Sequence, residues 1–159
     1  VAGDIDITAH ACSGIFDPDA DGVGAAIAVM ASYLEKAKES LKAARILFEA
    51  ECYNSCASRC YYAMFQIAIA ALERLGIHPP QGGRYGHAWV HAAIAREVVH
   101  RRKMLPAALA KALPDALKLR EEADYSDTML GRKRAERLLK HCQEFLSHLQ
   151  REVLRSVAS

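Results

Sequence analysis

The sequence lacks the patterns that mark several large classes of protein. No apolar run reaches the roughly 18 residues of a transmembrane helix, so we expect no membrane-spanning segment. No stretch alternates apolar and polar residues as a strand does, which argues against a sheet. The P-loop, the G-x-G-x-x-G turn and the G-x-S-x-G elbow are also missing. The formal net charge is only +2, so the total charge predicts no affinity for nucleic acid or an anionic membrane.

The cysteines and histidines form no disulfide or metal-binding pattern. The five cysteines are odd in number and have no framework spacing, so we expect free thiols in a reducing compartment, the cytoplasm. Cys52, Cys56 and Cys60 recur at every fourth position. On a helix the outer two would lie about 12 Å apart along the axis, too far to ligate one ion. We therefore expect packing cysteines, no metal site and no cofactor.

The start of the chain differs in composition from the rest. Residues 1–30 are rich in glycine, alanine and aspartate, show no helical period and contain no lysine or arginine. Segments of this kind rarely bury enough apolar surface to fold. We expect residues 1–30 to form a poorly ordered N-terminal extension and residues 31–156 to form one helical domain.

The rest of the chain has the period of amphipathic helices. Ser32 and Glu35 form a capping box that marks the start of the first helix. The second helix is apolar on nearly every side, as at the centre of a bundle, and Gly76 is suited to end it. Pro114 must kink or split the fourth expected helix, at about residues 106–125. The sequence predicts an all-α fold, an antiparallel up-and-down bundle of four to five helices. These helices cover about residues 32–51, 54–76, 87–103, 106–125 and 131–155.

A charged residue interrupts the apolar second helix. Arg59 shares a helical face with Tyr62 and Gln66, at spacings of three and seven residues. A guanidinium in such a helix needs a partner, and Asp124 is the candidate carboxylate. The arginine either forms a structural ion pair or lines a polar cleft that holds a phosphate or RNA. The candidate binding residues are Arg59, Tyr62, Gln66, Arg120, Asp124 and Tyr125.

Three segments resemble the HEPN family, especially its small stand-alone bacterial and archaeal members. They are S-R-C-Y-Y-A-M-F-Q at 58–66, R-E-E-A-D-Y at 120–125 and the closing helix from 134, and the likeness covers about residues 32–152. The resemblance implies an antiparallel helical bundle that often dimerises, and frequent pairing with a small nucleotidyltransferase encoded alongside. In active relatives it implies metal-independent RNA cleavage by an Arg and a His separated by four to six residues.

The chain departs from that pattern where many relatives carry histidine. Gln66 occupies the position, and an amide cannot act as a general acid or base. This favours a non-catalytic HEPN-like module that binds RNA, a nucleotide or a partner nucleotidyltransferase, within a toxin–antitoxin pair. One alternative is an active metal-independent endoribonuclease, in which Arg59 steadies the phosphate and His87 or His91 relays protons. The other is a structural homodimer without a ligand.

We also expect a symmetric homodimer. The helix at 54–76 is apolar on too many sides for a small monomeric bundle, and Trp89 and Val90 are candidates for exposed apolar residues on the third helix.

Overall fold

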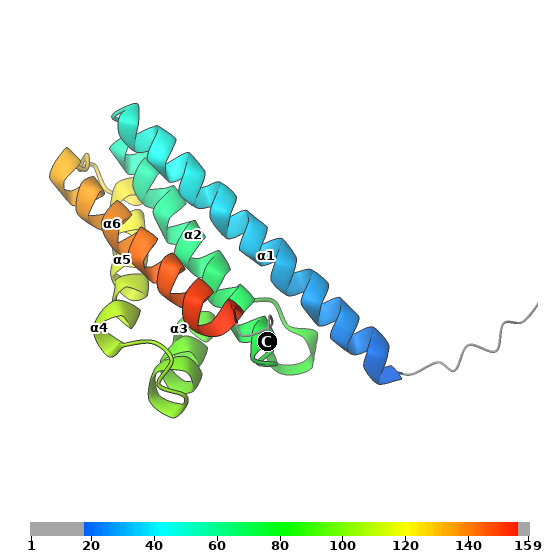
Figure 1. Cartoon of the computed structure of the whole chain (residues 1–159). Helices are drawn as coiled ribbons and strands as arrows, with labels where there is room; N and C mark the ends of the chain where they lie inside the picture. The colour runs from blue at the N-terminus through cyan, green and yellow to red at the C-terminus, as the bar shows by residue number, and fades with distance from the viewer. Residues whose placement is uncertain (1–17, 156–159) are drawn as a thin grey trace, which may run out of the picture.

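The computed structural model describes the backbone of residues 18–155 and the side chains of residues 22–155, and Figure 1 shows their arrangement. No strand occurs in this range, so the predicted all-α fold is confirmed. Two π-helical turns, η2 (Ile94–Arg101) and η3 (Gln150–Leu154), continue α3 and α6, and η1 (Pro80–Gly82) is a short 3-10 turn. The α-helices are α1 (Pro18–Glu49), α2 (Tyr53–Arg74), α3 (His87–Ala93), α4 (Ala107–Ala110), α5 (Ala112–Tyr125) and α6 (Arg132–Leu149).

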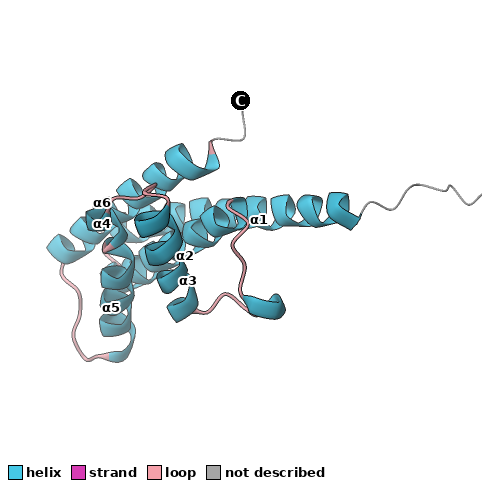
Figure 2. Ribbon diagram, turned by 90° about the horizontal axis from the view of Figure 1, so that it is seen from below, coloured by secondary structure: helices cyan, strands magenta, loops and turns pink. Residues whose placement is uncertain are grey.

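Helix α2 forms the centre of the bundle, as its apolar composition predicts. It packs against α1, α3, α5 and α6, and its large side chains are fully buried on several sides. In Figure 1, α1 runs opposite to α2 and α6, which is the up-and-down arrangement, and Figure 2 shows α5 lying across the direction of α1. The views in Figures 1 and 2 both place α2 between α1 and the remaining helices. The side chains of α2 therefore reach every neighbouring helix.

The first helix begins earlier than the sequence suggested. It starts at Pro18, so Ser32 and Glu35 lie in its interior and the predicted capping box is wrong. Residues 18–30 are helical, whereas 1–17, the rest of the expected extension, lie outside the described residues. The stretch from Ala25 to Ala31 contains no glycine or proline, so a helix that continues into it meets no break.

Two predicted helix ends are found close to their expected places. Gly76 has a φ of +70°, and the Ile77 amide donates to the Leu72 carbonyl at 2.9 Å, which closes α2 with a Schellman-type turn. The helix expected at 106–125 is split into α4 and α5 at Lys111. Pro114 then falls in the first turn of α5. Backbone amides in a first turn have no partner within the helix, so the missing amide hydrogen of proline costs no hydrogen bond there.

Polar contacts hold α5 against α2 and α6. The Asn54 side chain at the start of α2 donates to the Ala123 carbonyl at 3.1 Å and accepts from the Leu130 amide at 2.9 Å. Arg134 of α6 forms a bidentate pair with Glu122 of α5, with distances of 2.6 and 2.7 Å. These contacts fix the side of α5 that faces α2.

The cysteines and two α3 residues complete the packing. Cys56 and Cys60 are fully buried, as expected, whereas Cys52 is exposed. Contact with the Cys142 thiol, together with burial, raises the pKa of Cys60, so this thiol stays protonated. Val90 is fully buried, and the half-buried Trp89 packs on the Tyr85 ring at 5.8 Å. The expectation that Trp89 and Val90 lie exposed is therefore wrong.

Candidate functional site

Two arginines from different helices lie over one tyrosine ring. The guanidinium carbon of Arg59, on α2, is 5.0 Å from the centre of the Tyr62 ring. That of Arg120, on α5, is 5.2 Å from the same ring and 5.9 Å from the ring of Tyr125. Arg59 and Tyr62 meet because they are three residues apart on one helix. We refer to Arg59, Tyr62, Arg120 and Tyr125 as the arginine–tyrosine cluster.

The sequence had suggested that Asp124 pairs with Arg59, and this prediction is wrong. The Asp124 carboxylate accepts a hydrogen bond from Arg120 Nε at 3.0 Å, four residues earlier on the same helix. Arg59 is half-buried and forms no ion pair with any residue between 22 and 155. The cluster thus contains one neutralised arginine and one whose charge is not matched by a carboxylate in the described chain.

Gln66 lies apart from this cluster and faces α1. In the orientation that satisfies its neighbours, its amide nitrogen donates to Ser40 Oγ at 2.7 Å and to the Lys36 carbonyl at 3.0 Å. Gln66 therefore ties α2 to α1. Of the six candidate binding residues, the structure brings together all except this one.

The two candidate catalytic histidines converge on a buried hydroxyl that the sequence did not single out. Tyr61 Oη is 2.6 Å from His87 Nδ1 and 3.1 Å from His91 Nε2. The Tyr61 side chain is fully buried, His91 is half-buried and His87 is exposed. The phenol has one proton to donate, so one ring nitrogen accepts it while the other donates its N–H to the phenol oxygen. We refer to these three residues as the His–Tyr–His cluster.

Burial sets the protonation of this second cluster. It raises the pKa of the Tyr61 hydroxyl, an effect that the positive charge of Arg120 partly opposes, so the phenol is neutral at physiological pH. Burial, followed by the proximity of His87, lowers the pKa of His91. At neutral pH His91 is therefore an uncharged imidazole, the form that can accept a proton.

The two clusters meet at adjacent residues of α2. The rings of Tyr61 and Tyr62 are 5.7 Å apart between centroids, and Arg120 is near enough to affect the Tyr61 hydroxyl electrostatically. Adjacent residues on α2 point in directions about 100° apart, so Tyr61 meets α3 while Tyr62 meets α5. Both helices pack against α2, as Figure 2 shows. The site thus combines two cations with a neutral imidazole, and no group of described residues in it resembles a metal centre.

The all-α fold agrees with the result of comparison with known proteins. The HEPN domain family matches residues 30–152, so the chain belongs to the HEPN family, as its motifs indicated. Two relatives come from Methanocaldococcus jannaschii. The protein named "Putative toxin MJ0142" is 30% identical over 122 residues, which cover 76% of this chain and 79% of that protein. "Putative toxin MJ0605" is 26% identical over 122 residues, covering 74% and 84% respectively.

Between residues 18 and 155, no helix is both long enough and apolar enough to span a bilayer.

Proposed function

We propose that this protein is a toxin-like HEPN module that binds single-stranded RNA at the arginine–tyrosine cluster. The observation that carries the proposal is the half-buried Arg59, stacked on Tyr62 without a carboxylate partner in the described chain. A cation held in place but not neutralised favours an anion, and a phosphate accepts the forked hydrogen bonds of a guanidinium. The names of the two relatives support a toxin-like role.

The aromatic residues extend this proposal from phosphate to RNA. Tyr125 is 77% exposed, so its ring is open for stacking with an unpaired base. Proteins bind single strands by combining cations along the backbone with aromatic rings under the bases. In this arrangement Arg59 contacts a phosphate, and Arg120, already paired with Asp124, positions the two tyrosines.

A second candidate is RNA cleavage, which the His–Tyr–His cluster favours. The neutral His91 would take the proton from a ribose 2′-hydroxyl as that oxygen attacks the adjacent phosphorus. His87, on the exposed side, would give a proton to the departing 5′-oxygen, leaving a 2′,3′-cyclic phosphate and a 5′-hydroxyl. Arg59 and Arg120 would stabilise the charge that develops on the phosphorus centre, which requires no metal. Tyr61 would orient both imidazoles.

We also propose a homodimer and, by family resemblance, a small nucleotidyltransferase as partner. Support for a protein contact comes from exposed large apolar side chains on α1, Val23, Ile27 and Ile46. Light scattering at micromolar concentration should give twice the mass of one chain, and the mass of a single chain would remove the homodimer from the proposal.

Substitution of Arg59 separates binding from stability. Arg59→Ala should lower the affinity for a fluorescent oligouridylate and reduce the salt dependence of binding by about 0.7 in slope, one phosphate contact. The melting temperature should change little, because the stacking with Tyr62 contributes about 0.5–1 kcal/mol. Arg45→Ala removes an exposed arginine from α1 and is the matched control for net charge. Equal affinity in wild type and Arg59→Ala would refute the proposed binding site.

The same RNA distinguishes binding from cleavage. In EDTA, wild type that cleaves the oligonucleotide and a His91→Gln variant that binds without cleaving it would establish the second candidate. Intact RNA after prolonged incubation with the wild type would reject it.

A further inference from the structure

A cleft of about 230 Å³ lies next to the His–Tyr–His cluster, between η2 and the helices α4 and α5. His91, His100 and Lys111 are the polar residues that line the cleft. The walls are aliphatic and include Ile94, Ala95, Val99 and Leu113. An apolar recess with a few polar groups at its edge is the usual form of a site for a small organic group.

His91 belongs to both the cleft and the candidate site. Its Nε2 atom contacts the Tyr61 hydroxyl at 3.1 Å, while its side chain also lines the cleft. A strand bound at the clusters therefore has the cleft beside it. A chemical group that occupies the cleft could therefore belong to the strand that binds at the two clusters.

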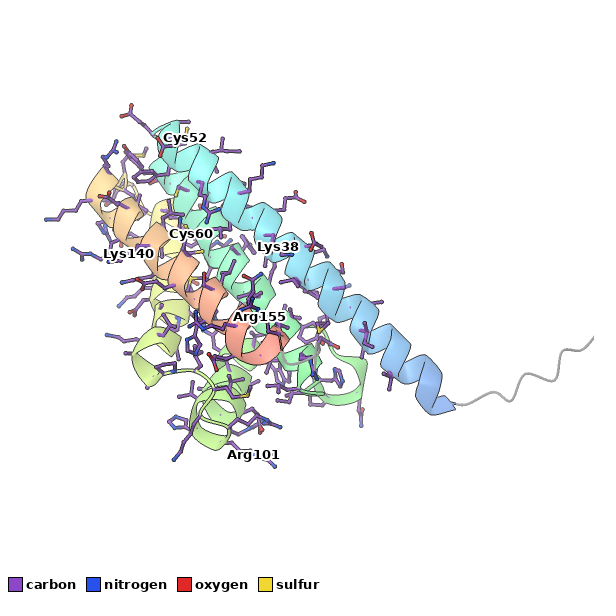
Figure 3. All side chains as sticks on the ribbon, in the orientation of Figure 1. Lys38, Cys52, Cys60, Arg101, Lys140 and Arg155 are labelled. Atoms are coloured by element: carbon purple, nitrogen blue, oxygen red, sulfur yellow. The ribbon has the colours of Figure 1, made fainter. Side chains whose placement is uncertain are left out.

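The charge around the cleft suits a polyanion. The Lys111 side chain is 74% exposed and forms a long, exposed ion pair with Asp115 at 4.0 Å, which leaves the ammonium group open to a further anion. Near the cleft, η2 and the residue that follows it carry three arginines paired with the buried Glu97, namely Arg96, Arg101 and Arg102. None of the three lines the cleft, and Figure 3 shows Arg101 at the outer end of the molecule. Three guanidinium groups against one carboxylate leave this end positively charged.

We propose that the cleft takes one nucleobase of an RNA strand whose backbone crosses the arginine–tyrosine cluster. This inference rests on the proposed RNA binding and adds a base-specific subsite to it. The aliphatic walls cover the faces of the base, the His91 ring borders it, and Lys111 meets the phosphate outside. Positive charge at the edge favours a nucleotide over an apolar side chain of a partner protein.

Filling the cleft tests the proposal without changing any charge. Ala95 is exposed and lines the cleft, so Ala95→Leu places extra methyl groups inside it. Ala92, also exposed and nearly one turn earlier on α3, is not one of the lining residues, so Ala92→Leu is the matched control. Affinity is measured by fluorescence anisotropy for three probes of equal length and charge: hexauridylate, hexaadenylate and an abasic ribose-phosphate hexamer. Circular dichroism melts confirm that each variant is folded.

The expected result is a loss that depends on the base. Ala95→Leu should weaken binding of the better base-bearing strand by about tenfold, the contribution of one well-held base, and leave the abasic hexamer unaffected. Ala92→Leu should match the wild type on all probes. Photocrosslinking with 4-thiouridine should label the peptide that contains residues 91–100.

Three results would overturn the inference, and they differ in whether the proposed RNA binding also fails. If Ala95→Leu equals the wild type, or weakens all three probes alike, the cleft holds no base, while Arg59-dependent binding would still stand. If Ala95→Leu leaves RNA binding intact but alters the mass in light scattering, the cleft holds a protein side chain. If the wild type binds none of the probes, the proposed function fails as well.

Discussion

Removal of the Tyr61 hydroxyl is the sharpest test of the His–Tyr–His cluster. Tyr61→Phe keeps the buried ring and deletes one oxygen that contacts His87 Nδ1 at 2.6 Å and His91 Nε2 at 3.1 Å. A typical hydrogen bond contributes about 0.5–1.5 kcal/mol net. His87 is exposed and can turn to water, whereas the half-buried His91 cannot do so freely. We therefore expect a destabilisation of about 1–2 kcal/mol, or about 2–8 °C in melting temperature for a chain of this size.

The matched control is the neighbouring residue. Tyr62→Phe deletes a hydroxyl that makes no hydrogen bond with residues 22–155 and keeps the ring under both arginines. It should melt within about 1 °C of the wild type, since surface-type changes stay within about 0.5 kcal/mol. Thermal melts at pH 8 and histidine NMR titrations of the three proteins complete the assay. Equal melting temperatures for Tyr61→Phe and Tyr62→Phe, with unchanged His91 titration, would refute the cluster.

Two further predictions concern pH. His91 has a lowered pKa in the folded protein, so the unfolded chain binds more protons below about pH 6.5, and stability should fall as the pH drops from there. His91→Gln should flatten this fall in melts from pH 8 to 5, and an equally steep fall would contradict the assignment. The hydrogen bond from Arg102, at 2.6 Å, followed by that from Arg96, lowers the pKa of Glu97, so its contribution is present above about pH 4.3 and is lost on acidification. Glu97→Gln should be less stable than the wild type at pH 7 by urea unfolding and nearly equal at pH 3, and a constant difference would count against the network.

The helices could be predicted because their signals are local. Gly76 ends α2 because a left-handed backbone is needed at that position, and Pro114 separates α4 from α5 because proline suits only the first turn of a helix. The start of α1 was missed because Ser32 and Glu35 look like a cap, although good helix formers precede them. Capping residues in a sequence permit a helix start but do not require one.

The site was only partly predictable because it depends on directions around α2. Arg59 stood out as a cation in an apolar helix, which led to Tyr62 and Arg120. The pairing of Arg120 with Asp124 was available in the sequence as an i, i+4 spacing, and long-range pairing with Arg59 was preferred in error. No local signal says which of Tyr61 and Tyr62 faces α3, because that choice follows from how three helices pack.

Gln66, which stands where many family members carry histidine, lies at the contact between α1 and α2. Gln66 lies two turns of α2 beyond Arg59, about 10 Å along the axis, and its amide is held by Ser40 and Lys36 of α1. An imidazole there would meet the same partners on α1. The histidines of the candidate site come instead from α3, where His87 and His91 share the Tyr61 hydroxyl. Gln66 therefore belongs to the α1–α2 contact, and in the cleavage proposed as the second candidate function His87 and His91 of α3 would carry the protons.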